Sequence, residues 1–248
     1  MADLTVNKTI CPLCGRATIK ANAIAQTANI EDAGLWYHCS CGIIFNSEIP
    51  NHRDNKEDIK VMTGMKEYPL PLVQSARVYA PLIEELTLSR KMLDVGFQTE
   101  ANMDFFKERG WVPFGIDNNK YISRGKRIIK DNFETYENFC KEEFDLVWMG
   151  HVVEKFKDPI KAILHARTIL KENGVLFLST PDIDFLFSKT FREWQHWDKD
   201  RNYIMFNETS IKRELERMGF KVIMSRRNYF SRFGHFHDIH LIAQKVYF

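Results

Sequence analysis

Four of the five cysteines in this 248-residue chain lie before residue 50. Cys11 and Cys14 form a C-x2-C pair, and Cys39 and Cys41 form a C-x-C pair later in the same segment. A glycine follows each pair and allows the tight turns that bring four thiolates around one ion. We therefore predict a closed, structural zinc site. The alternative interpretation is two unrelated pairs of buried thiols.

A glycine and an acid mark a second region that could bind a ligand. An apolar run over residues 92–95 ends at Gly96, a helical pattern covers residues 100–109, and an apolar run over residues 114–117 ends in Asp117. This order is that of a strand, a turn, a helix and a second strand. In nucleoside-binding α/β units, an acid about 20 residues after such a glycine accepts hydrogen bonds from ribose hydroxyls. The alternative role of Asp117 is that of a solvated loop acid.

Histidines supply the candidate general bases. His151 directly follows the apolar run over residues 144–149, and we favour it for that reason. His196 is the second candidate because it lies in an insertion over residues 182–206. The insertion is rich in aromatic residues, which either form the wall of a substrate pocket or simply cover the core. Further candidates near the end of the chain are His235, His237 and His240.

The elements that position these residues alternate between strand and helix. Helical patterns cover residues 100–109, 158–170 and a stretch that begins at Asn207 or Thr209 and ends near Met218. The alternation predicts an α/β fold with a doubly wound, mostly parallel sheet of seven strands that closes with an antiparallel strand. The predicted strands are residues 92–95, 114–117, 127–130, 144–149, 175–179, 220–225 and 239–246.

We expect three parts along the chain. Residues 1–50 form a zinc-binding, ribbon-like module with short strands at residues 35–37 and 43–45. This segment is too short to build its own core, so the metal supplies most of its folding free energy. Residues 51–90 form a linker and covering helices, and residues 91–248 form the α/β domain.

Composition narrows the class of protein and its partners. Lys and Arg number 35 and Asp and Glu 33, for a net charge of +2. This near-neutral balance argues against a dedicated nucleic-acid binder, which usually carries a basic stripe. No apolar run approaches the roughly 20 residues of a membrane span, and the start lacks the pattern of a signal peptide. We therefore expect a cytoplasmic protein with no membrane partner, whose reduced cysteines bind metal rather than form disulfides.

Several features of the sequence, in this order and spacing, resemble the class I S-adenosylmethionine-dependent methyltransferases. They are MLDVG (92–96), GID (115–117), Asp131, the segment 144–159, LKENGVLFLSTP (170–181), and FNE (206–208) with MGF (218–220). The resemblance covers almost all of the chain. It is strongest to small-molecule methyltransferases with an N-terminal cysteine zinc module, some of which act on sugar nucleotides.

The resemblance implies a Rossmann-like sheet, the cofactor S-adenosylmethionine and a small-molecule acceptor, for which sugar- or nucleotide-linked molecules are candidates. In it, Asp117 binds the ribose hydroxyls, Asp131 or Asn132 meets the adenine, and Asp94 either contacts the cofactor region or holds loop amides. The cofactor-binding set that it implies is Asp94, Gly96, Asp117, Asn118, Asp131 and Asn132.

The turn after the first strand departs from the family pattern. It reads GFQTEA, so Gln98 and Glu100 stand where the family usually has its second and third glycines. A side chain at Gln98 could fill the space of the methionine group, and Glu100 brings a negative charge near the methionine carboxylate. Three hypotheses therefore remain: a small-molecule methyltransferase, a catalytically weakened methyltransferase fold that serves as a binding module, and a nucleic-acid-modifying methyltransferase.

Overall fold

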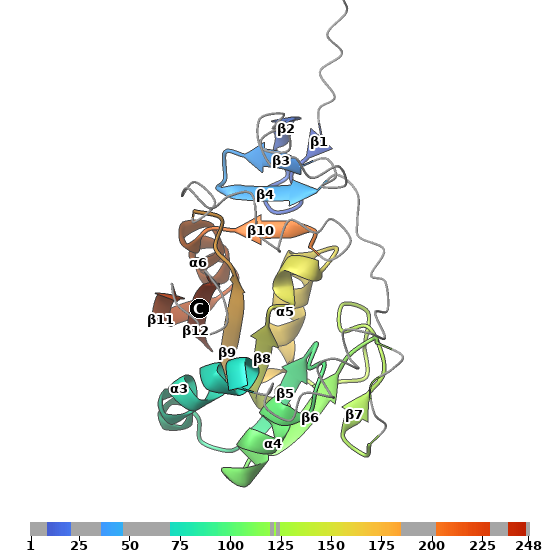
Figure 1. Cartoon of the computed structure of the whole chain (residues 1–248), viewed down its shortest axis with the longest axis vertical. Coiled ribbons are helices and arrows are strands. Elements are labelled where there is room, and N and C mark those ends of the chain that lie inside the picture. The colour runs from blue at the N-terminus through green and yellow to red at the C-terminus, as the bar shows by residue number, and fades with distance from the viewer. Residues whose placement is uncertain are drawn as a thin grey trace, which may run out of the picture.

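The computed structural model describes residues 9–20, 36–46, 70–119, 122, 125–184, 202–228 and 238–246. Its larger sheet has seven strands, and its smaller sheet has five (Figure 1). In spatial order the larger sheet contains β11 (Phe220–Asn228), β12 (Asp238–Lys245), β9 (Leu170–Pro181), β8 (Phe144–Gly150), β5 (Lys91–Val95), β6 (Val112–Ile116) and β7 (Ile128–Ile129).

The five neighbouring strands β9, β8, β5, β6 and β7 run parallel to one another. Strand β12 is antiparallel to both β9 and β11. The predicted seven-stranded, mostly parallel sheet with an antiparallel close is therefore confirmed. Val95 pairs with Ile116 on one side and with Met149 on the other. This register brings the ends of β5, β6 and β8 to the same edge, where α/β sheets bind their ligands.

Helices cover both faces of the larger sheet, as a doubly wound fold requires. On one face α3 (Leu70–Leu86) and α4 (Ala101–Glu108) pack on a cluster that contains Met92, Trp148 and Phe177. On the other face α5 (Pro159–Ile169) and α6 (Glu208–Arg217) join the larger core. Every residue of β8 before Gly150 is buried, which explains its almost wholly apolar sequence.

Helix α5 ends at Ile169, one residue before the predicted end, and Leu170 already has an extended backbone. The strand predicted at residues 175–179 therefore begins earlier, at Leu170. Leu170 is fully buried and pairs with Phe144, so joining the sheet buries its side chain at once. Asn173 (φ 58°) and the following glycine lie within β9, where the register with β8 shifts.

Helix α6 begins where one of the two predicted caps stands. Asn207 accepts a hydrogen bond from the Ser210 amide (2.8 Å), and the Ser210 hydroxyl accepts one from the Asn207 amide (3.1 Å). This reciprocal capping box satisfies two otherwise unpaired amides. Of the two candidates, the cap is therefore Asn207 and not Thr209.

The smaller sheet joins strands of the N-terminal segment to one strand from the last third of the chain. It contains β1 (Thr9–Ile10), β2 (Ala17–Lys20), β3 (Trp36–Cys39), β4 (Ile43–Asn46) and β10 (Ile204–Phe206). Strand β10 pairs antiparallel with β4 and lies between the cysteine-bearing strands and the larger domain (Figure 1). The division of the chain at residues 50 and 90 stays a prediction, and the role of β10 was not foreseen. None of the helices in the described ranges is long and apolar enough to cross a bilayer.

Candidate active site and metal site

The four N-terminal cysteines converge. Cys11 and Cys14 lie on the turn after β1, and Cys39 and Cys41 lie where β3 turns into β4. Their Sγ atoms are all within 4.8 Å of one another, with Cys11 to Cys41 at 3.7 Å and Cys14 to Cys39 at 3.5 Å. Sulfur ligands at about 2.3 Å from a tetrahedral zinc ion lie about 3.8 Å apart. The donor set therefore fits a structural zinc ion.

The raised pKa values of two of these thiols are consistent with a cation-binding site. Burial raises the pKa of the Cys11 thiol to about 12 and also raises the pKa of Cys41. Buried thiols of this kind ionise only when a positive charge balances them. The cluster is tied to the rest of the protein, because the Arg213 guanidinium of α6 donates to the Cys41 carbonyl (3.1 Å).

Gly96 makes the turn after β5, with φ at 68°. Its amide donates to the Ile116 carbonyl (2.8 Å), which joins the turn to the end of β6. A Cβ atom at this position would lie 2.8 Å from Val152 Cγ2. Glycine is therefore required here both by the backbone conformation and by the close approach of Val152.

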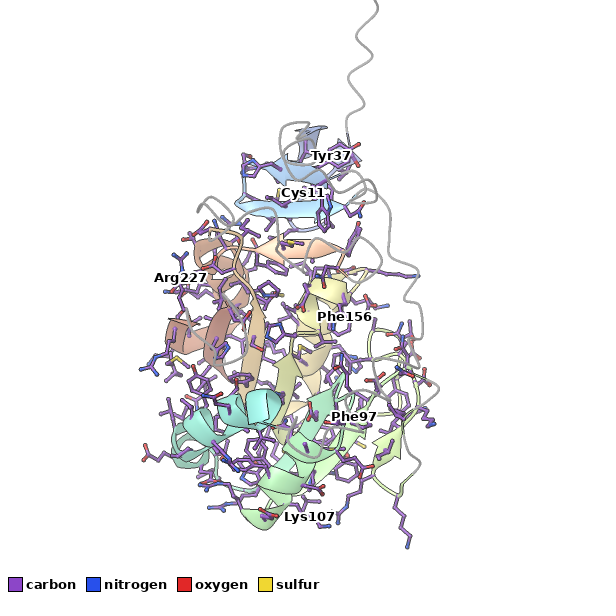
Figure 2. All side chains as sticks on the ribbon, viewed as in Figure 1. Cys11, Tyr37, Phe97, Lys107, Phe156 and Arg227 are labelled. Carbon is purple, nitrogen blue, oxygen red and sulfur yellow. The ribbon has the colours of Figure 1, made fainter. Side chains whose placement is uncertain are left out.

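Of the two positions where the family usually has further glycines, Gln98 has a glycine-like backbone conformation and Glu100 (φ −75°) does not. Gln98 has φ at 49°, a left-handed conformation that glycine adopts readily. Phe97, labelled in Figure 2, is buried. Its ring lies over Gly115, where an added Cβ would meet Phe97 Cδ1 at 2.7 Å. The aromatic side chain therefore packs against β6, and the Gln98 side chain is partly exposed.

Asp117 links the ends of two neighbouring strands. Its Oδ1 accepts a hydrogen bond from the Asn119 amide (2.8 Å), and its Oδ2 accepts a longer one from the Gln98 amide (3.3 Å). The residue is partly exposed, and each oxygen of a carboxylate can accept more than one hydrogen bond. The carboxylate therefore orders the turn and retains capacity for hydroxyl donors.

Asp131 and Asn132 lie at the end of the adjacent strand β7, which pairs with β6. Asp131 accepts from the Asn132 amide (2.7 Å), and Asn132 accepts from the Glu134 amide (2.9 Å). Asp131 and Asn118 are both exposed. The topology thus places all of these predicted cofactor residues along one edge, next to Asp117.

Asp94 is buried beneath that edge. Its Oδ2 accepts a hydrogen bond from Asn102 Nδ2 (2.7 Å) on the first turn of α4. Burial raises the pKa of Asp94 to about 7, against the hydrogen bond from Asn102, and the charge of Asp117 adds to the increase. Asn102 Oδ1 has no hydrogen-bond partner among the described residues. Sequence reasoning missed Asn102, because an asparagine in a helix carries no distinctive signal.

His151 leaves the end of β8 with φ at 51°. Its Nε2 lies 3.3 Å from Asp238 Oδ2, and its Nδ1 lies 3.9 Å from Glu154 Oε1. Its side chain is 30% exposed, whereas both carboxylates are buried. Burial lowers the pKa of His151, but the charge of and hydrogen bond to Asp238, with the charge of Glu154, outweigh it and raise the pKa overall, although Lys155 opposes them.

The other histidine candidates divide into two groups. His240 is buried, and its Nδ1 lies 3.0 Å from the Tyr79 hydroxyl of α3. Burial lowers the pKa of His240 to about 4, so it is a neutral core residue rather than a base at neutral pH. His196, His235 and His237 lie outside the described residues, as does most of the aromatic insertion over residues 182–206.

Comparison with known proteins identifies the family. The profile described as the methyltransferase domain matches residues 72–225, which is more than half of the chain. The chain belongs to the methyltransferase domain family. The match spans the methyltransferase strands β5 to β9 and helices α4 to α6, and it ends before β12.

Among curated relatives, a ubiquinone biosynthesis O-methyltransferase of Histophilus somni is 28% identical over 120 residues. That alignment covers 42% of this methyltransferase-family chain and 48% of the relative. The curated relatives that the chain matches are covered over 48% and 60% of their lengths, so it spans about half to three fifths of each.

Solved structures share the fold at low identity. One is the complex between the Trm112 methyltransferase activator of Haloferax volcanii and a candidate methyltransferase, with a TM-score of 0.61, 12% identity, and coverage of 81% of this chain and 99% of that one. Another is a Burkholderia thailandensis 1,6-didemethyltoxoflavin-N1-methyltransferase with bound S-adenosylhomocysteine, with a TM-score of 0.54, 14% identity, and coverage of 85% and 98%.

Proposed function

We propose that the protein transfers a methyl group from S-adenosylmethionine to a small-molecule acceptor. The observation that carries this proposal is the meeting of Gly96, Asp117 and His151 at one edge of the sheet, where β5, β6 and β8 end. When bound, S-adenosylmethionine supplies an electrophilic methyl group. The family relatives with O- and N-methyltransferase names support a small acceptor with a hydroxyl or amine.

Each side chain at this edge has a role in the proposal. Asp117 accepts hydrogen bonds from the ribose hydroxyls, and these charge-assisted bonds are strong. Asp131 or Asn132 contacts the adenine, with Asn118 beside them, and the Gly96 turn approaches the methionine part. Asp94 holds α4 through Asn102, which fixes that turn from below. The four cysteines hold a structural zinc ion outside the reaction centre.

His151 acts as the general base in this proposal. Methyl transfer to oxygen or nitrogen requires proximity and alignment, together with a group that takes the acceptor's proton. The imidazole is partly exposed at the end of β8, next to Val152, which contacts the Gly96 turn. His196 remains a second candidate base in the insertion.

Calorimetric titration with S-adenosylmethionine and with S-adenosylhomocysteine tests the cofactor assignment. We expect both to bind, and Asp117→Asn to weaken binding at least roughly tenfold, because a lost charge-assisted hydrogen bond is worth about 1.5–3 kcal/mol. Asp104→Asn is the matched control, since Asp104 is an exposed acid of the neighbouring helix. Wild-type protein that binds neither ligand at millimolar concentration would overturn the proposal.

The same experiment separates the second candidate function. A methyltransferase fold used as a binding module is favoured by the loss of two glycines at Gln98 and Glu100. In that case neither nucleoside ligand binds, although the protein is folded and the zinc module is intact. A co-purifying S-adenosyl compound would count against this alternative.

A further inference from the structure

We propose that Asp238 is a positioning residue that fixes the ring of His151 and leaves Nδ1 as the nitrogen that accepts the acceptor's proton. The inference rests on the proposed role of His151 as base. Neither the sequence motifs nor the family match points to Asp238, because the matched residues end at position 225.

The topology of the sheet explains why Asp238 reaches this edge. Strand β12 is antiparallel to β9, so its first residue lies beside the last residue of β9, where Asp238 pairs with Pro181. The carboxyl ends of the parallel strands and the amino end of β12 therefore share one edge. Asp238 is buried there, 7% exposed, with Oδ2 at 3.3 Å from His151 Nε2.

This contact determines the tautomer of the imidazole. An ionised carboxylate only accepts hydrogen bonds, so Nε2 must carry the hydrogen that it donates to Asp238. In the neutral ring, Nδ1 then holds the lone pair. With S-adenosylmethionine bound, Nδ1 would take the acceptor's O–H or N–H proton, and the freed electron pair would form the bond to the methyl carbon that the cofactor supplies as the carbon–sulfur electrons return to sulfur. Exposure of the ring lets the proton pass to solvent afterwards.

Glu154 assists from the opposite side of the ring. Its Oε1 lies 3.9 Å from Nδ1, too far for a hydrogen bond but close enough to stabilise a positive charge. The carboxylate is held in place because Oε2 accepts from the Thr180 hydroxyl (3.2 Å) and the Glu154 carbonyl accepts from the Tyr203 amide (2.8 Å). The imidazolium formed in the reaction therefore lies between two fixed carboxylates.

The charged groups around His151 give the sign of the expected change. Asp238 on β12 and Glu154 on the short helix Val153–Lys155 favour the imidazolium, whereas Lys155 opposes it. Burial and, in turn, the charge of His151 lower the pKa of His240. The net effect raises the pKa of His151. Neutralising Asp238 must therefore lower that pKa, so that a larger fraction of the ring is neutral but the charge formed during transfer loses a partner.

The test uses NMR of the imidazole resonances in the full-length protein, with the His151 signals assigned by their loss in His151→Asn. Asparagine tolerates the positive φ at this position. We expect the titration midpoint of His151 to fall by one unit or so, on the order of tenfold in proton affinity, in Asp238→Asn. It should stay within error in Asp184→Asn, whose exposed carboxylate pairs with Arg227. Asp238→Glu, which keeps the charge, should restore part of the shift.

A second measurement needs no variant at Asp238. In wild-type protein above the midpoint, long-range nitrogen–proton correlation spectra should show the Nε2–H tautomer of His151. The Nδ1–H tautomer, or an unchanged midpoint in folded Asp238→Asn, would overturn the proposal. Both readouts are independent of methyl transfer, so failure of S-adenosylmethionine to bind would refute the proposed function and leave the His151–Asp238 pairing to be judged by itself.

Discussion

Gln98 has an unusual backbone conformation for a residue with a side chain. It occupies a left-handed conformation in the turn that binds the methionine part in the family, at a position where glycine is usual. An L-residue in this conformation costs roughly 1–2 kcal/mol relative to glycine. Gln98 therefore holds a backbone conformation that a glycine would adopt without strain.

Gln98→Gly should relieve this strain. Because glycine also increases the entropy of the unfolded chain, we expect a net gain of at most about 1 kcal/mol in the free energy of unfolding. Thermal or urea denaturation measures it, and calorimetry should show unchanged or tighter binding of S-adenosylhomocysteine. Gly96→Ala is the opposing control, since its methyl group would meet Val152 and should destabilise the protein. A Gln98→Gly protein that is clearly less stable would mean that the side chain makes a needed contact.

Asp94 predicts a pH dependence of stability. Burial raises its pKa to about 7, above the ordinary value of 3.8. Between these values the folded protein holds a proton that the unfolded chain has released, so this carboxyl destabilises the fold increasingly as the pH rises from about 4 to about 7. Asp94→Asn removes the effect, and its amide can donate to Asn102 Oδ1, which lacks a partner among the described residues.

Urea unfolding at pH 5 and pH 8 provides the measurement. The free energy of unfolding of Asp94→Asn minus that of wild type should be larger at pH 8 than at pH 5. Asp104→Asn, which changes an exposed acid, serves as the control for general charge effects. The same pH dependence in wild type and in Asp94→Asn would show that Asp94 does not hold the extra proton.

At the scale of elements, β10 connects the cysteine module to the reaction edge. Its three residues pair with β4, and the Tyr203 carbonyl just before it accepts from the Asn46 amide (2.8 Å). The Tyr203 amide in turn donates to the carbonyl of Glu154 (2.8 Å), whose side chain faces His151. A folded module therefore supports the backbone that carries Glu154.

Cys39→Ser tests this connection and the metal assignment together. Metal analysis of wild type should find about one zinc ion per chain, and the variant should lose it, because a structural zinc site needs all four ligands. We expect the N-terminal strands to unfold and the amide signal of Tyr203 to lose its protection from hydrogen exchange. Cys140→Ser changes an exposed cysteine outside the cluster and should keep both the zinc and the protection. Metal-free protein with an intact N-terminal sheet would contradict the assignment.

At the scale of the whole molecule, the distribution of charge helps to distinguish a nucleic-acid partner from a small-molecule acceptor. Several arginines that could have formed a basic patch are paired with carboxylates: Arg213 and Arg217 contact Glu214, and Arg227 contacts Asp182 and Glu208. Together with the net charge of +2, this pairing reduces the positive potential that these three arginines of the described ranges offer to a phosphate backbone.

We therefore expect no specific, salt-dependent binding of nucleic acid. Fluorescence anisotropy with labelled RNA and duplex DNA at 50 and 200 mM salt is the measurement. Affinity that is absent or weak at both concentrations fits a small-molecule acceptor. Binding that is tight at low salt and falls steeply between the two conditions would instead revive the nucleic-acid-modifying alternative, since counterion release produces that slope.

The sequence by itself predicted much of this protein. Apolar runs bounded by glycine, acid or proline located the parallel strands at the centre of the larger sheet, because a buried parallel strand must be apolar throughout. Cysteine spacing predicted the metal cluster, and the glycine and acid around residues 96 and 117 predicted the ligand-binding edge. These signals are local: each depends on residue types within one turn, strand or helix.

Only the tertiary structure placed Asp238 beside His151 and added β10 to the cysteine module. Asp238 and β10 each contact partners that are distant in the chain. The residue types around them do not indicate these contacts. Asp238 looked like an ordinary acid before a strand, and its role depends on β12 running antiparallel to β9. Contacts of this kind depend on the register and direction of whole strands. These are fixed when the strands assemble into the sheet and its faces become buried.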